Sequence, residues 1–100
     1  MQVTKTVKET RDLIKNWKRE GKTIGLVPTM GFLHEGHASL IKRCREENDI
    51  VVVSDFVNPT QFGPTEDLEA YPRDFKRDSE LCESLGADVI FHPEPKDMYH

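Results

Sequence analysis

The sequence predicts an α/β domain, a Rossmann-like parallel sheet with flanking helices. Two observations indicate this class. Helical and strand patterns alternate along the chain, and residues 50–57 are a nearly continuous run of β-branched and aromatic residues, typical of a strand covered on both faces. A strand, a helix and a second strand in this order form a right-handed βαβ crossover. Three parallel strands and three helices then make half of a doubly wound sheet.

The composition fits one globular domain and disfavours several classes of protein. The chain has 100 residues, enough for one core and too few for two full domains. Hydrophobic residues make up 36% and charged residues 32%, so the surface is polar. The net charge of −4 argues against nucleic acid or an anionic membrane as a partner. Because neither a signal peptide nor a membrane-spanning run of ~20 apolar residues is visible, we expect a cytoplasmic protein.

The first helix is expected over residues 6–20. Thr6 and Glu9 have the spacing of a capping box, apolar residues follow at intervals of three and four, and Gly21 offers a C-cap. Trp17 is expected to be a core residue of this helix.

A short strand follows at residues 24–27. Gly25 within it predicts the close approach of another backbone or of a ligand, and Pro28 is expected to end the strand. The next helix should end near Asn48. One face of it is predicted to be formed by His37, Leu40, Ile41 and Cys44.

The buried strand leads into a loop at residues 58–71, which is longer than most connections in compact domains. Pro72 suits the first turn of a third helix, Gly86 ends it, and the last strand is expected at 88–91. The apolar face of this helix consists of Phe75, Cys82 and Leu85. The chain has no CxxC pair, so both cysteines are predicted to be reduced. A solvated charged surface is expected from Glu66, Asp67, Glu69, Asp74, Lys76, Arg77 and Asp78.

The segment PTMGFLHEGH at residues 28–37 is the main candidate for chemistry. It joins the end of a strand to the start of a helix, where free backbone amides and the positive end of the helix dipole favour an anion such as phosphate. His34 and His37 can both donate hydrogen bonds to one phosphoryl group, and Gly36 between them leaves room for a nucleotide. The loop segment NPTQF at 58–62 should face this segment.

Other interpretations of these residues stay open. The two histidines could simply cap the helix. A metal site is disfavoured because HEGH lacks the HExxH spacing used for zinc, and His92 and His100 would complete such a site only if the tail folded back. The amides of Asn58 and Gln61 could hold a polar substrate or only cap a turn.

Three stretches carry a resemblance to a known family: VPTMGFLHEGH at 27–37, FVNPTQFGPTEDLEAYPR at 56–73 and GADVIFHP at 86–93. With these motifs in this order, the chain resembles the N-terminal part of the pantothenate synthetase family, also called pantoate-beta-alanine ligases. The HxGH motif alone indicates the wider HIGH-type nucleotidyltransferase superfamily, and FVNPTQF after a strand narrows the resemblance to this ligase.

The resemblance implies a cytoplasmic ligase of pantothenate biosynthesis, which supplies a coenzyme A precursor. Such an enzyme joins pantoate to beta-alanine with ATP and Mg2+, through a pantoyl adenylate, and releases AMP and diphosphate. The intact enzyme would be a homodimer. The alternatives are a non-catalytic fragment that binds ATP or pantoate or self-associates, and a cytidylyltransferase-like nucleotidyltransferase.

The resemblance also assigns site residues. His34 and His37 would act at the triphosphate, with His37 as the proton donor. The ATP-binding residues would be Met30, Gly31, Phe32, Leu33, His34, Glu35, Gly36 and His37. Pantoate and beta-alanine would be bound by Gln61, Pro28, Thr29, Asn58 and Tyr71. No metal-binding residue is predicted.

The chain departs from the family in two respects. The family's chain is much longer, so residues 1–100 would be the N-terminal portion of its Rossmann-like nucleotide-binding domain. The remainder of the catalytic domain and the C-terminal lid domain would be absent, and we expect little or no turnover by the chain alone. The family also has an apolar residue where Asp55 lies in the buried strand. Because an unpaired, ionised carboxylate is costly there, Asp55→Ile is expected to raise thermal stability.

Overall fold

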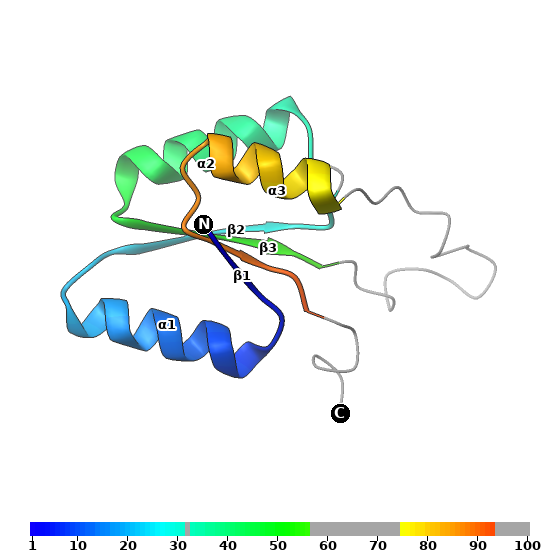
Figure 1. Cartoon of the computed structure of the whole chain (residues 1–100). Coiled ribbons are helices and arrows are strands. Elements are labelled where there is room, and N and C mark those ends of the chain that lie inside the picture. The colour runs from blue at the N-terminus through cyan, green and yellow to red at the C-terminus, as the bar shows by residue number, and fades with distance from the viewer. Residues whose placement is uncertain (32, 57–74, 94–100) are drawn as a thin grey trace.

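The computed structural model describes residues 1–31, 33–56 and 75–93, which form one sheet with helices on both faces (Figure 1). The elements are β1 (Gln2–Thr4), α1 (Val7–Arg19), β2 (Ile24–Thr29), α2 (Glu35–Glu47), β3 (Ile50–Asp55), α3 (Phe75–Ser84) and β4 (Val89–Phe91). The strand order is β1-β4-β3-β2, and every neighbouring pair is parallel. The predicted α/β class with a Rossmann-like parallel sheet is therefore confirmed.

The structure adds β1 to the three strands that the sequence predicts. This strand pairs with β4, with Gln2 opposite Val89. Only Thr4 of its three residues is buried, and its hydroxyl shares a 2.7 Å hydrogen bond with that of Thr10 in α1. A strand this short and this exposed carries no apolar run, so its sequence gives no strand signal.

The prediction that Pro28 ends the second strand is wrong, because β2 continues to Thr29. The backbone carbonyls of Thr23 and Thr29 accept hydrogen bonds from the β3 side of the sheet. Since the backbone groups of a strand alternate in direction, the nitrogen of Pro28 lies on the side away from β3. That side has no neighbouring strand among the residues described, so the proline removes no ladder hydrogen bond.

The glycine in β2 lies against side chains from the C-terminal end of α2. A Cβ at Gly25 would lie 2.2 Å from Cys44 Sγ and 2.6 Å from Asn48 Nδ2. The expected lack of space at Gly25 is found, but the neighbours are side chains and not the backbone or ligand that was predicted.

The helices cover the sheet in two layers, with α1 on one face and α2 and α3 on the other (Figure 1). Alternating residues of β3 point to opposite faces of the sheet. Val51 and Val53 belong to the core under α2 and α3, whereas Ile50 and Val52 belong to the core under α1. The same alternation directs Asp55 to the α2 and α3 face.

Most of the predicted core residues are confirmed. Trp17 packs against the core under α1, and Phe75 and Leu85 pack against the core under α2 and α3. The prediction for Leu40 is wrong, because its side chain is 57% exposed. Leu40 lines a surface hollow together with the exposed Leu26 of β2. Since β2 is the edge strand, the sheet does not extend far enough to cover Leu40.

The helix boundaries follow the capping signals. Thr6 is the N-cap of α1 and accepts a 3.1 Å hydrogen bond from the Glu9 amide. Gly21 and Gly86 take positive φ angles of 80° and 88° just after α1 and α3. Both cysteines are free, as predicted. The predicted loop at 58–71 and the predicted helix start at Pro72 lie outside the described residues.

Candidate functional site

All four parallel strands deliver their carboxyl ends to one edge of the sheet, and three of them are followed there by candidate site residues (Figure 1). At this edge β2 is followed by Met30, β3 by Phe56 and β4 by His92. The segment after β2 leads directly into the N-terminus of α2, as the sequence predicts for residues 28–37. Ligands of open α/β sheets bind at this edge, so the candidate site lies here.

The two histidines of the predicted phosphate site cap α2. His34 is the N-cap, and its Nδ1 accepts a 3.0 Å hydrogen bond from the Gly36 amide. The Nδ1 atom of His37 accepts a 3.3 Å hydrogen bond from the His34 amide, and the two ring centroids lie 4.2 Å apart. A neutral imidazole whose Nδ1 accepts carries its proton on Nε2. The expectation that the two histidines cap the helix is therefore correct for their Nδ1 atoms. With Nδ1 used in this way, each ring presents an Nε2–H donor at the start of α2.

The environment of His37 favours its neutral form. Partial burial lowers the pKa of His37, the neighbouring His34 lowers it further, and the carboxylate of Asp78 opposes both effects. A neutral His37 at physiological pH acts on an anion as a hydrogen-bond donor through Nε2–H. This is the tautomer that the capping geometry selects.

The backbone between β2 and α2 is fixed by polar side chains. Thr29 Oγ1 donates to the Ser54 carbonyl at 2.9 Å and accepts from the Gly31 amide at 3.2 Å. Gly31 has a φ of 86°, which L side chains rarely adopt. The Leu33 amide donates to Asp78 Oδ1 at 2.8 Å, while the Leu33 side chain is fully buried in the core. These hydrogen bonds fix the backbone at Gly31 and Leu33, just before the start of α2.

A buried pair of carboxyl groups lies behind this segment. Asp55 at the end of β3 is 4% exposed and Asp78 of α3 is 1% exposed. Asp55 Oδ1 and Asp78 Oδ2 converge on one point, 2.7 Å and 3.5 Å from the position that a Cβ of Gly31 would take, so a hydrogen bond can join the two groups when one of them is protonated. The expectation of an Asp55 inside a buried strand is confirmed, and the expectation that it lacks a partner is wrong. Asp55 faces Asp78 because it continues the side of β3 that α2 and α3 cover.

The prediction of a solvated Asp78 is wrong. Phe75, Asp78 and Cys82 follow one another at intervals of three and four, so Asp78 lies in the buried stripe of α3. Lys76 and Arg77 are exposed, as expected. The other members of the predicted charged surface lie outside the described residues: Glu66, Asp67, Glu69 and Asp74.

His92 lies at the same edge of the sheet and is a further candidate residue, which the sequence pattern alone does not assign to the nucleotide site. Its Nδ1 donates to the Asp55 carbonyl at 3.0 Å, and its ring stacks on Phe75 with centroids 4.3 Å apart. The sequence contains a signal for His92, because this residue directly follows a strand that ends at the ligand-binding edge of the sheet. The neighbouring Cys82 supplies no nucleophile, since burial raises the pKa of its thiol to about 12.

No group of three or more potential metal-ligating side chains occurs among the residues that the structure describes. Within the same ranges, no helix is long and apolar enough to cross a membrane. Four of the predicted substrate-binding residues lie outside these ranges: Phe32, Asn58, Gln61 and Tyr71. The predicted encounter of residues 28–37 with 58–62 lies outside them as well.

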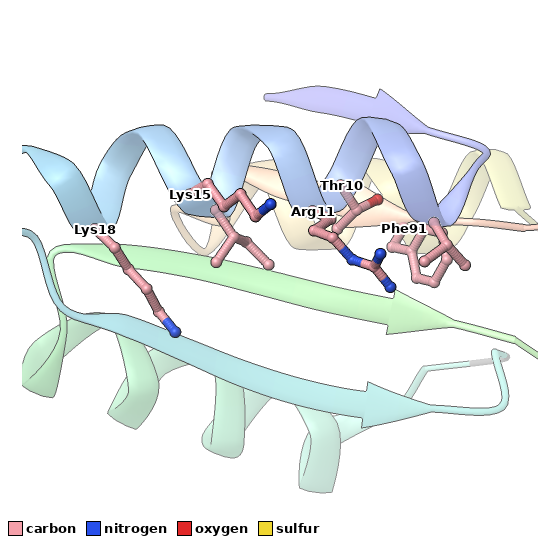
Figure 2. Close-up of a pocket in the computed structure, with 7 residues that line it drawn as sticks. Thr10, Arg11, Lys15, Lys18 and Phe91 are labelled. Carbon is pink, nitrogen blue, oxygen red and sulfur yellow. The ribbon is translucent and has the colours of Figure 1, made fainter.

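A hollow of about 390 Å³ lies along α1, away from the candidate site (Figure 2). The basic side chains of Arg11, Lys15 and Lys18 come to it from the helix, and Phe91 of β4 closes one end. None of the predicted site residues lines this hollow. Its three basic side chains make this hollow the competing location for an anionic ligand.

The fold and the edge site define a nucleotidyltransferase-like Rossmann domain. The chain belongs to the pantoate-beta-alanine ligase family, whose model matches residues 2–100. It is 59% identical over 99 residues to the pantothenate synthetase of Clostridium acetobutylicum, an alignment that covers 99% of this chain and 35% of the relative. The pantothenate synthetase of Bacillus licheniformis is 63% identical over 94 residues, which cover 94% of this chain and 33% of that protein.

Solved structures agree with this assignment. The pantothenate synthetase of Thermus thermophilus superposes with a TM-score of 0.88 at 46% identity, covering 99% of this chain and 34% of that one. The pantoate-beta-alanine ligase of Francisella tularensis, in complex with beta-gamma ATP and beta-alanine, superposes with a TM-score of 0.89 at 45% identity. That match covers 99% of this chain and 38% of the other. The chain thus spans about a third of the length of the relatives it matches.

Proposed function

We propose that this chain is the ATP-binding first part of a ligase that condenses pantoate with beta-alanine to pantothenate. The observation that carries the proposal is the pair of Nε2–H donors of His34 and His37 at the start of α2, in a member of the pantoate-beta-alanine ligase family. The Francisella tularensis relative in complex with ATP and beta-alanine supports the substrate class. The intact enzyme would be a cytoplasmic homodimer that acts on small molecules.

In the proposed reaction the pantoate carboxylate attacks the α-phosphorus of ATP, and diphosphate leaves. The amine of beta-alanine then attacks the carbonyl carbon of the pantoyl adenylate, and AMP leaves. Both steps depend on alignment and on stabilisation of developing negative charge. His34 and His37 would supply that stabilisation by donating from Nε2 to the phosphate oxygens, with His37 as the proton donor.

The remaining residues would position the substrates. The nucleotide would lie along Met30, Gly31, Phe32, Leu33, His34, Glu35, Gly36 and His37. Leu33 would contribute through its backbone, because its side chain is fully buried. Pantoate and beta-alanine would contact Pro28, Thr29, Asn58, Gln61 and Tyr71. Mg2+ neutralises phosphate charge when it is bound with ATP, and such ions are usually held by the phosphates with one or two carboxylates.

A chimera tests this function. Residues 2–100 replace the matching first part of the Clostridium acetobutylicum pantothenate synthetase, to which they are 59% identical over 99 residues. We expect the chimera to form AMP from ATP only when both pantoate and Mg2+ are present, and pantothenate when beta-alanine is added. The 100-residue chain alone is expected to show little or no turnover.

The parent Clostridium acetobutylicum enzyme is the positive control. AMP formation that ignores pantoate would contradict the ligase assignment. Consumption of CTP in preference to ATP would favour the cytidylyltransferase alternative. A chimera that binds ATP and pantoate without releasing AMP would favour the non-catalytic binding alternative.

A further inference from the structure

Two buried carboxyl groups meet beside Gly31, where Asp55 Oδ1 and Asp78 Oδ2 lie 2.7 Å and 3.5 Å from the point that a Cβ of Gly31 would occupy. A hydrogen bond between these two groups requires a proton on one of them. Ionised carboxylates accept hydrogen bonds and cannot donate them, so the bond exists only while one group is protonated. Both side chains are almost fully buried, at 4% and 1% exposure. Loss of this proton to solvent would leave two negative charges in contact in a dry environment, which is costly.

The pair touches the backbone on which the histidines depend. Asp78 Oδ1 accepts the Leu33 amide at 2.8 Å, and Leu33 directly precedes the N-cap His34. Asp55 Oδ1 lies so close to Gly31 that a Cβ there would come within 2.7 Å. Because Asp55 lies against Gly31 and Asp78 holds the Leu33 amide, a change in the separation of the two carboxyl groups shifts the backbone that orients His34 and His37.

Among the described residues, the charges around Asp55 come from three directions. His92, which follows β4, attracts the negative charge of Asp55. From α3, Asp78 repels it, and the buried thiol of Cys82 lies close enough to feel the Asp55 charge. From α2, His37 interacts with Asp78. Burial raises the pKa of Asp55, His92 opposes this effect, and Asp78 adds to it through its charge and a hydrogen bond, so that the pKa of Asp55 lies at about 6. Asp55 thus changes its protonation close to neutral pH.

We propose that Asp55 and Asp78 are positioning residues that share one proton, and that loss of this proton releases the Leu33 amide and loosens the His34–His37 pair. Asp55 donates to Asp78 in the protonated state, and Asp78 holds Leu33 with its other oxygen. The consequence for nucleotide binding rests on the proposed function, whereas the coupling of the Leu33 amide to Asp55 does not.

The test follows the carboxyl carbons of carbon-13 labelled aspartates and the backbone amides by NMR, from pH 4 to pH 8. We expect the Asp55 carboxyl carbon and the Leu33 amide to move with the same midpoint near pH 6. Amide hydrogen exchange at Leu33 should be about tenfold slower at the acid end than at the alkaline end, after correction for the intrinsic pH dependence of exchange. A Leu33 amide that stays in place while Asp55 titrates would overturn the proposal.

Variants separate this coupling from histidine titration, which ordinarily occurs in the same pH range. Asp55→Asn keeps a hydrogen-bond donor for Asp78 and loses the ionisable group, so the Leu33 transition should disappear. Asp12→Asn, which removes an exposed carboxylate of α1, is the matched control and should retain it. A Leu33 transition that persists in Asp55→Asn would assign it to the histidines. If Asp55→Asn does not fold, the ring carbons of His34 and His37 are followed in the wild type. A Leu33 midpoint that matches the Asp55 carboxyl carbon and differs from both histidines supports the proposal, and one that matches a histidine ring and differs from Asp55 overturns it.

A second experiment tests the effect of the pair on nucleotide binding. It measures the Kd for Mg-ATP of the wild type and of Asp55→Asn at pH 5 and at pH 8. We expect similar values at pH 5 and about tenfold tighter binding by the variant at pH 8, since one charge-assisted contact is worth about this factor. Equal values at both pH values would overturn the positioning role. Absence of ATP binding at any pH, together with an intact Leu33 transition, would refute the proposed function and leave the proton-sharing pair standing.

Discussion

Replacing His37 by alanine is expected to lower pantoate-dependent AMP formation by the chimera about 100-fold. The substitution removes one of the two Nε2–H donors at the start of α2 and leaves the other, His34, without the ring that contacts it. Loss of a single preorganised donor to a developing oxyanion costs about 100-fold to 1,000-fold in kcat. We expect most of the effect in kcat, because the donor acts most strongly on the charge of the transition state.

His37→Ala also removes an acceptor from the cap of α2, which costs about 1 kcal/mol of stability. The melting temperature is therefore measured alongside, and kcat is compared below the transition. Lys42→Ala, an exposed change on the same helix, is the matched control and should leave kcat unchanged. A decrease in kcat of less than about threefold by His37→Ala would contradict a role in charge stabilisation.

Replacing Asp55 by asparagine is expected to stabilise the chain by about 2 to 3 kcal/mol near pH 8 and to change little near pH 4. The folded state raises the pKa of Asp55 from 3.8 to about 6. The folded state therefore binds the Asp55 proton more tightly than the unfolded state does. The stability that this proton contributes is present below about pH 4 and is lost as the pH rises through about 6. Asparagine has no proton to lose, so its advantage develops over that same interval.

Urea unfolding at several pH values measures this difference. Asp12→Asn is again the matched control, because its carboxylate is 57% exposed. Isoleucine, the substitution that the sequence alone suggests, also removes the charge but offers Asp78 no donor, so we expect a smaller gain from Asp55→Ile. A wild-type stability that rises from pH 4 to pH 8 relative to Asp55→Asn would contradict the assigned direction of the pKa.

Sequence periodicity predicts the elements with clear apolar patterns. The buried run of β3 and the capped helix α1 are found where the pattern places them. β1 is missed because three mostly exposed residues carry no such pattern. The end of β2 is misplaced because proline is tolerated on an edge strand, and the sequence does not say which strands lie at the edge.

The sequence predicts the part of the candidate site that depends on the order of the elements, and it misses the part that depends on how they pack together. The order of the elements is enough to place residues 28–37 at the carboxyl edge of the parallel strands, where the structure has them, and ligands of such sheets bind at that edge. The inward direction of Asp78 is encoded in the spacing of Phe75 and Cys82, but a charged residue is normally assigned to the surface. Its contact with Asp55 joins two elements far apart in sequence and becomes visible only when α3 is placed over β3.

The most direct test of the central claim, that the start of α2 is the phosphate site, is an amide NMR spectrum of the 100-residue chain with and without Mg-ATP. We predict a dispersed spectrum with shifts concentrated at Gly31–His37. Shifts concentrated instead beside Arg11, Lys15 and Lys18 would place the anion in the hollow along α1 (Figure 2). That outcome, or a dispersed spectrum that ignores ATP, would contradict the claim that this chain carries a preformed phosphate site at His34 and His37.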